Sequence, residues 1–210
     1  MAGWFCTSCA AATPPPPAVT LQSLFQAAAN RDSGRILRME PAVAASSDPV
    51  LGIALPIALY RADPTRFAQR FAESFPTSYG ELMAGVYPIE LAGVVPEFGF
   101  TVRALGELAR AGNGTAARKI VLALPHSDGV VSEALFEELT EVLSVRPRAV
   151  LRAFTLLTSS EQASVLQSLR HALPKDRAEA IAQALRQLED LSGDETAAAD
   201  TIRSAIQQSQ

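Results

Sequence analysis

The chain has 210 residues, of which 48% are hydrophobic and 19% charged, a balance typical of a globular protein rather than a disordered one. Its net charge of −4 argues against a nucleic-acid-binding protein, because such proteins usually present a clustered basic face. Of the 18 basic residues only Lys119 and Lys175 are lysines, and this bias, together with abundant alanine, indicates a bacterial source.

Residues 1–18 are expected to form a tail outside the fold. The tail contains Cys6, Cys9 and four consecutive prolines at 14–17, which favour a stiff polyproline II spacer. Cys9, followed by small residues and this proline run, resembles the start of a mature bacterial lipoprotein. That resemblance implies lipidation at Cys9 and an envelope location. Without it the default expectation is a cytoplasmic protein, since the tail lacks the apolar run of a signal peptide.

Residues 19–193 are predicted to form one helical domain, with a possible sub-boundary near 93–96. Thr20 is a candidate cap for a first helix, and residues 36–39 fit either a short strand or a helical turn. Asp48-Pro49 and Asp63-Pro64 each place a capping aspartate before a proline at the first helical position. Phe67, Phe71 and Phe75 then recur at four-residue steps, which predicts a core-facing stripe.

The apolar run from Val50 to Tyr60 is interrupted by Pro56 and is too short for the ~20 residues that span a bilayer. We therefore expect a kinked core helix and no transmembrane segment. Residues 85–99 give no clear pattern.

From Pro96 to Leu191 the chain predicts a series of short amphipathic helices, grouped in hairpins that begin near Pro96, Val131 and Ser160. The first helix has Phe98 on its apolar face. The nearly all-apolar segment 147–157 is predicted to lie at the centre of the fold. A spacing of roughly 30–35 residues matches a helical-hairpin repeat, although an irregular bundle gives the same spacing.

Later boundaries follow from cap patterns. Ser159-x-x-Gln162 and Asp176-x-x-Glu179 resemble capping boxes for the fifth and sixth helices of this series, and Gly193 is a candidate helix stop. Residues 194–210 are expected to form a weak terminal helix and a frayed tail. The fold prediction is thus all-α, with about nine to ten short helices in antiparallel hairpins, arranged as a solenoid-like repeat array or an irregular bundle.

No catalytic, metal or cofactor motif stands out. Cys6-x-x-Cys9 has no second pair of ligands, and a zinc site usually needs four. His126-Ser127-Asp128 contains the residue types of a hydrolase triad, but adjacent residues cannot align three side chains. We interpret it as a turn in which Asp128 caps the next helix. Neither a cofactor nor a metal is therefore predicted.

Charged residues in the second half are candidates for partner binding. Glu133, Glu137 and Glu141 form a row on one helix face and, with Arg148 and Arg152, are the predicted contact residues. The alternative for the acidic row is an ordinary solvated helix face. Glu138 lies at the edge of the apolar stripe and is expected to pair with an arginine of a neighbouring helix.

The segment 87–100 is the candidate ligand pocket. It holds Tyr87, Glu90 and Glu97 among aromatic and aliphatic residues, and two carboxylates in such a setting suit acid–base chemistry if one is desolvated.

The favoured functional hypothesis is a non-catalytic interaction module that binds a protein or peptide. The alternatives are an envelope lipoprotein tethered through Cys9, and a small-ligand binder or enzyme that uses the acidic residues of 87–100.

Overall fold

The computed structural model describes residues 18–208, and every regular element in that part of the chain is a helix. This confirms the all-α prediction. Twelve α-helices have five residues or more, so the predicted number of nine to ten is too low. The α-helices are α1 (Leu21–Ala29), α2 (Ser33–Ala44), α3 (Pro49–Ala62), α4 (Pro64–Ser74), α5 (Tyr79–Glu81), α6 (Tyr87–Leu91), α7 (Phe100–Arg110), α8 (Gly114–Ala123), α9 (Gly129–Val145), α10 (Pro147–Phe154), α11 (Ser159–Ala172), α12 (Lys175–Arg186) and α13 (Gly193–Gln207).

Aspartates followed by proline begin two of the helices as predicted. The carboxylate of Asp48 accepts a hydrogen bond of 2.9 Å from the backbone N–H of Val50, and that of Asp63 accepts one of 3.1 Å from Arg66. Each satisfies an N–H that the first turn of a helix leaves without an intrahelical partner. Thr20 caps α1 in the same way, through the N–H of Ser23.

The phenylalanine stripe of α4 is buried as expected. Phe71 stacks on Tyr60 of α3 with ring centroids 4.7 Å apart, and the Phe75 ring meets Phe71 edge-on at 6.4 Å. These contacts join α3 to α4, and Phe67 is buried beside them. α3 continues through Pro56, and no helix in the described part of the chain is long and apolar enough to cross a membrane.

The sequence leaves the secondary structure of two N-terminal regions open, residues 36–39 and the segment that begins at residue 85. Residues 36–39 are not a strand but part of α2, which Asp32 caps and which buries Ile36 and Val43. Residues 79–91 form one continuous helical run, α5, a π-helix (Leu82–Val86) and α6. Gly85 lies against α3 there, because a Cβ at this position would overlap the side chain of Ile53.

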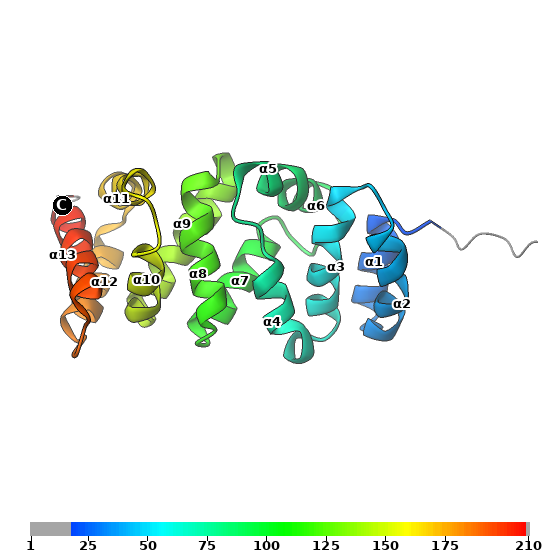
Figure 1. Cartoon of the computed structure of the whole chain (residues 1–210), viewed down its shortest axis with the longest axis horizontal. Helices are drawn as coiled ribbons and strands as arrows, with labels where there is room; N and C mark the ends of the chain where they lie inside the picture. The colour runs from blue at the N-terminus through cyan, green and yellow to red at the C-terminus, as the bar shows by residue number, and fades with distance from the viewer. Residues whose placement is uncertain (1–17, 209–210) are drawn as a thin grey trace, which may run out of the picture.

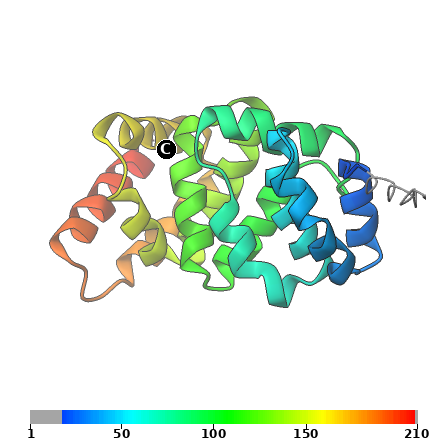
Figure 2. The ribbon, with the colours of Figure 1, turned by 45° about the vertical axis from the view of Figure 1, so that its right-hand side comes forward.

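Helical hairpins line up along one direction, and the two ends of the described chain lie at opposite ends of an elongated molecule (Figure 1). The hairpins are α3–α4, α7–α8, α9–α10 and α12–α13. One row of contacts runs from α7 to α9 to α12, and a second runs from α4 to α8 to α10 to α13. Figure 2 shows the same order of helices along the long axis. α5, α6 and α11 lie along one edge of both rows (Figure 1).

Helix starts near the C-terminus differ from the predicted ones. Thr158 and Glu161, rather than Ser159 and Gln162, form the capping box of α11. α12 begins after Pro174 without a side-chain cap, so Asp176 does not play that role. The hairpin expected from Ser160 onward does not form, because α12 packs chiefly on α9 and then on α13, whereas α11 packs on α13 and the 3-10 turn Leu124–His126.

Gly193 does not stop the helix before it, contrary to the prediction from the sequence, because α12 already ends at Arg186. Gly193 is the first residue of α13, and Ser192 and Glu195 form its capping box. α13 packs against α10, α11 and α12 and buries an apolar face made of Ala198, Ala199, Ile202, Ala205 and Ile206. A boundary near 193 would therefore separate this helix from the core that it completes.

The segment 147–157 is shorter as a helix than its composition predicts. α10 ends at Phe154, and Leu156 in the following turn is 55% exposed. Arg152 is exposed and Arg148 is only partly buried, so the helix is amphipathic and is not buried on all sides.

Candidate functional site

The segment between α6 and α7, residues 92–99, crosses the surface and lines two grooves. Ala92, Gly93 and Val94 face α1, and Phe98 and Gly99 face α9. The sequence placed a candidate pocket in 87–100, and the structure brings this segment to hollow surface on both of its sides.

Glu90 is buried, and its carboxylate stabilises the start of α7. Its carboxylate accepts hydrogen bonds from the backbone N–H groups of Gly99, at 2.9 Å, and Thr101, at 2.8 Å. Gly99 precedes α7 with a φ of 81° and has no side chain to cap the helix. The distant Glu90 therefore supplies the cap that the local sequence lacks.

Glu97, in contrast, lies at the surface. Its side chain is 58% exposed and forms an ion pair with Arg103 of α7. The two carboxylates thus have different partners and different exposure, with Glu90 buried on the backbone at the start of α7 and Glu97 at the surface. Tyr87 packs its ring edge-on against Phe98, with centroids 6.5 Å apart, and so supports the wall of a groove.

The first groove lies between Phe98 and α9 and has a volume of about 220 Å³. We call it the acidic groove, and it is lined by Phe98, Gly99, Arg103, Val130, Glu133, Ala134, Glu137 and Glu138. Phe98 and Val130 are 40% and 44% exposed, which leaves two large apolar side chains in contact with water. Glu133 and Glu137 are exposed, and neither forms an ion pair with any residue in 18–208.

The sequence pattern predicts the charged residues of this groove but not its apolar ones. Glu133 and Glu137 were candidates, whereas Phe98 was assigned to the buried face of a helix. α7 begins at Phe100, two residues later, so Phe98 lies outside the helix. The hydrophobic pattern does not show where α7 begins, because the residue that caps this helix is Glu90, which lies in α6.

Glu138 and Glu141 belong to an internal charge network. Glu138 is buried against α7 and pairs with Arg110, which confirms the expected pairing with a neighbouring helix. Burial raises the pKa of Glu138, although the Arg110 guanidinium opposes that rise. Glu141 contacts Arg110 at 2.9 Å and Arg177 of α12 at 2.7 Å, and so joins three helices.

Arg148 and Arg152 tie α10 to the start of α13. Arg148 donates to the backbone carbonyls of Glu189 and Asp190, the latter at 3.0 Å. Arg152 donates through Nε to Glu195 at 2.8 Å. The pKa of Glu195 is lowered, first by the backbone N–H of Ser192 and then by Arg152. Neither arginine pairs with the acidic row.

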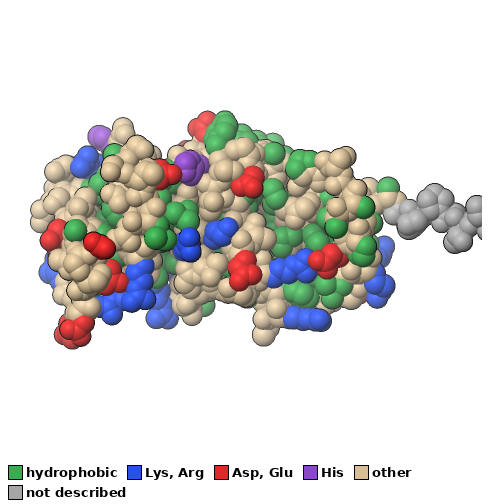
Figure 3. Space-filling view, viewed as in Figure 1, with side chains coloured by type: hydrophobic (Ala, Val, Ile, Leu, Met, Phe, Trp, Pro, Cys, Tyr) green, Lys and Arg blue, Asp and Glu red, His purple; other side chains and the backbone are tan. Residues whose placement is uncertain are grey.

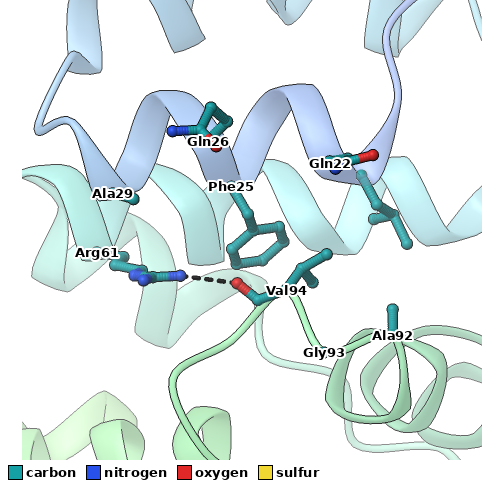
Figure 4. Close-up of a pocket in the computed structure, with 9 residues that line it drawn as sticks. Gln22, Phe25, Gln26, Ala29, Arg61, Ala92, Gly93 and Val94 are labelled. Carbon is teal, nitrogen blue, oxygen red and sulfur yellow. Dashed lines mark hydrogen bonds between the residues drawn. The ribbon is translucent and has the colours of Figure 1, made fainter.

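The second groove, which we call the Arg61 cleft, lies between α1 and residues 92–94 and holds about 500 Å³. Figure 4 shows the Phe25 ring directed from α1 toward this segment, and Arg61 reaching the carbonyl oxygen of Val94. That hydrogen bond, from Nη1, is 2.7 Å long. Leu21, Gln22, Gln26 and Ala29 of α1 complete the wall.

Charge is unevenly spread on the face seen in Figure 3, where most Lys and Arg side chains lie in the lower half, whereas hydrophobic ones are scattered from the upper edge to the lower right. No cluster of three metal-binding side chains occurs among residues 18–208. Cys9 lies outside the described residues. No family model matches the chain, and no curated protein or solved structure shows significant similarity to it.

Proposed function

We propose that this protein is a non-catalytic interaction module that binds a protein or peptide segment in the acidic groove. The observation that carries this proposal is the exposure of Phe98 and Val130 beside Glu133 and Glu137, two carboxylates that form no ion pair within residues 18–208. Exposed apolar side chains rimmed by charged groups are characteristic of protein interaction sites.

We further infer that the hairpins form a helical-repeat array rather than a closed bundle. Each hairpin packs chiefly on its neighbours along the two rows of contacts, and the molecule is elongated (Figures 1 and 2). Arrays of this kind present extended surfaces on which grooves between repeats take peptide partners.

The groove's chemistry specifies the partner. An apolar side chain of the partner would cover Phe98 and Val130, and flanking lysines or arginines would face Glu133 and Glu137. Burial of apolar surface would supply most of the affinity. The exposed charges would favour basic partners over acidic ones and make binding depend on salt.

A peptide titration tests this. Fluorescein-labelled peptides with a central Leu or Phe between Lys and Arg residues would be titrated with the full chain, and fluorescence anisotropy read at two salt concentrations. We expect the double variant Glu133→Gln/Glu137→Gln to weaken binding about threefold to tenfold, because exposed ion pairs contribute roughly 0.2–1 kcal/mol each. Phe98→Ala should weaken it about tenfold or more, since the apolar contact is lost.

Matched variants control for the change of charge or surface. Glu179→Gln/Glu189→Gln removes the same charge from exposed positions outside the groove, and Leu91→Ala removes a side chain that is 62% exposed. Neither should alter binding. Equal binding of peptides in which Glu replaces Lys and Arg, or no binding of either kind, would contradict the proposal.

A further inference from the structure

The Arg61 cleft has the opposite polarity to the acidic groove. No Asp or Glu among residues 18–208 forms an ion pair with Arg61. Its half-buried guanidinium uses one donor on the carbonyl of Val94. A guanidinium has five N–H donors in a planar fork that matches a carboxylate, so an edge of Arg61 remains for a ligand.

Two free amides lie on the same wall. Gln22 and Gln26 are exposed on α1, four residues apart and therefore on one face of the helix. Neither side chain has a hydrogen-bond partner in the described part of the chain. An amide both donates and accepts, so this pair can bond to the N–H and C=O groups of an extended peptide backbone.

The dimensions of the cleft suit a short extended segment. Gln22 and Ala29 are both in the wall, and seven residues of helix rise about 10 Å. Three extended residues span a similar distance, at roughly 3.3 Å each. Arg61 lies at the Ala29 end of this wall (Figure 4), while Leu21 and Ala92 offer apolar surface along it and the Phe25 ring is buried.

We infer that the Arg61 cleft binds the C-terminal end of a peptide, with the terminal carboxylate on Arg61 and the preceding backbone on Gln26 and Gln22. A single arginine matches the single charge of a carboxylate. A phosphate dianion normally draws several cationic or N–H donors, and Arg61 is the only cationic side chain in the lining. This site is independent of the acidic groove and of the function proposed for it.

Chemical-shift perturbation of the ¹⁵N-labelled full chain tests the inference with a pair of probes. One is the pentapeptide Gly-Ser-Gly-Ala-Leu with a free carboxylate, and the other is the same peptide with a C-terminal amide. At up to about 5 mM, above the millimolar dissociation constants expected for so few contacts, the acid should shift the amide signals of Ala29, Gly93 and Val94. The amide form should bind at least about tenfold more weakly.

Variants locate the effect. Arg61→Gln should remove the preference for the free acid, and Gln22→Ala/Gln26→Ala should weaken binding of the acid. Arg118→Gln makes the same change of charge at an exposed arginine of α8 and should have no effect. Because the comparison of acid with amide is made on the unmodified protein, it stands even if Arg61→Gln disturbs the segment 92–94.

Three results would overturn the inference. One is the absence of shifts in the cleft, and another is equal binding of the acid and the amide. The third is equal binding of an amide-capped peptide that ends in Glu, which would show that the cleft takes any carboxylate rather than a chain terminus.

Discussion

Glu138 and Gly106 meet where α9 packs against α7. The buried carboxylate lies directly on the α7 backbone, and a Cβ at position 106 would overlap it. The glycine therefore makes room for the Glu138–Arg110 pair, and the position should be intolerant of any side chain.

Gly106→Ala is expected to lower the free energy of unfolding by about 1–3 kcal/mol, because Glu138 must move from its place against Arg110. Gly52→Ala is the matched control, since Gly52 lies within α3 and a Cβ there meets nothing within 4 Å. That change should stabilise the protein by roughly 0.5–1 kcal/mol through helix propensity. Urea denaturation measures both, and equal effects of the two changes would show that the contact with Glu138 is unimportant.

Glu138 should contribute measurably to the pH dependence of the unfolding free energy. Its pKa in the folded protein is raised by burial, so the folded state binds this proton more tightly than the unfolded chain, where the pKa is about 4.3. The associated stability is fully present below the unfolded value and is lost as pH rises through the folded one. Relative to Glu138→Gln, the unmodified protein should gain stability as pH falls from 7 toward 4.5.

The variant is needed because other carboxylates act in the opposite direction. The pKa values of Glu161 and Glu195 are lowered, mainly by hydrogen bonds with Thr158 and Ser192, so their contributions fall on acidification. They are present in both proteins and cancel in the difference between the two urea-unfolding free energies. A difference that shrinks on acidification would contradict the assignment to Glu138.

At the scale of elements, the start of α7 depends on Glu90, a residue of another helix, α6. Glu90 of α6 satisfies the N–H groups of Gly99 and Thr101, and so fixes both the start of α7 and the course of residues 92–99. Both grooves share this segment as a wall, which makes Glu90 a support for their shape.

Glu90→Ala should cost about 3 kcal/mol of unfolding free energy, because the buried N–H of Thr101 and the partly buried N–H of Gly99 lose a charged acceptor. Glu90→Gln should cost less, since the amide oxygen can still accept one of the two bonds. Glu97→Gln, at an exposed ion pair, should change stability by less than about 0.5 kcal/mol. Denaturation measures the three values, and hydrogen exchange at Gly99 and Thr101 should accelerate only in the Glu90 variants.

The sequence predicted those elements whose signals are local. Asp48-Pro49, Asp63-Pro64 and the phenylalanine stripe of α4 carry their cap and their buried face within a few residues, and the structure confirms them. Residues 85–91 do not, because the π-helical segment Leu82–Val86 shifts the period and Gly85 is set by contact with Ile53. For the site, Glu133 and Glu137 were readable as a charged row, whereas the exposure of Phe98 and the pairing of α12 with α13 depend on long-range packing.

At the scale of the whole molecule, the helical-repeat array that we propose implies that each helix depends for its stability mainly on its neighbours. α1 packs mainly on α2 and α3, whereas α13 packs on α10, α11 and α12. In a repeat array the unfolding free energy is approximately a sum over the units and their interfaces. A destabilising substitution at one end should therefore have less effect on the stability of the other end. In a compact bundle all helices share one core, so a substitution in any helix should destabilise all of them.

Two buried-to-alanine changes at opposite ends distinguish these cases. Leu24 of α1 and Ile202 of α13 are both fully buried, and truncation of either should cost about 2–5 kcal/mol locally. Hydrogen exchange followed by mass spectrometry should show faster exchange in α1–α4 for Leu24→Ala and in α10–α13 for Ile202→Ala. Each variant serves as the control for the other. Uniform acceleration along residues 18–208 in both would mean one cooperative core, and the two grooves would then be features of a bundle surface rather than of an array.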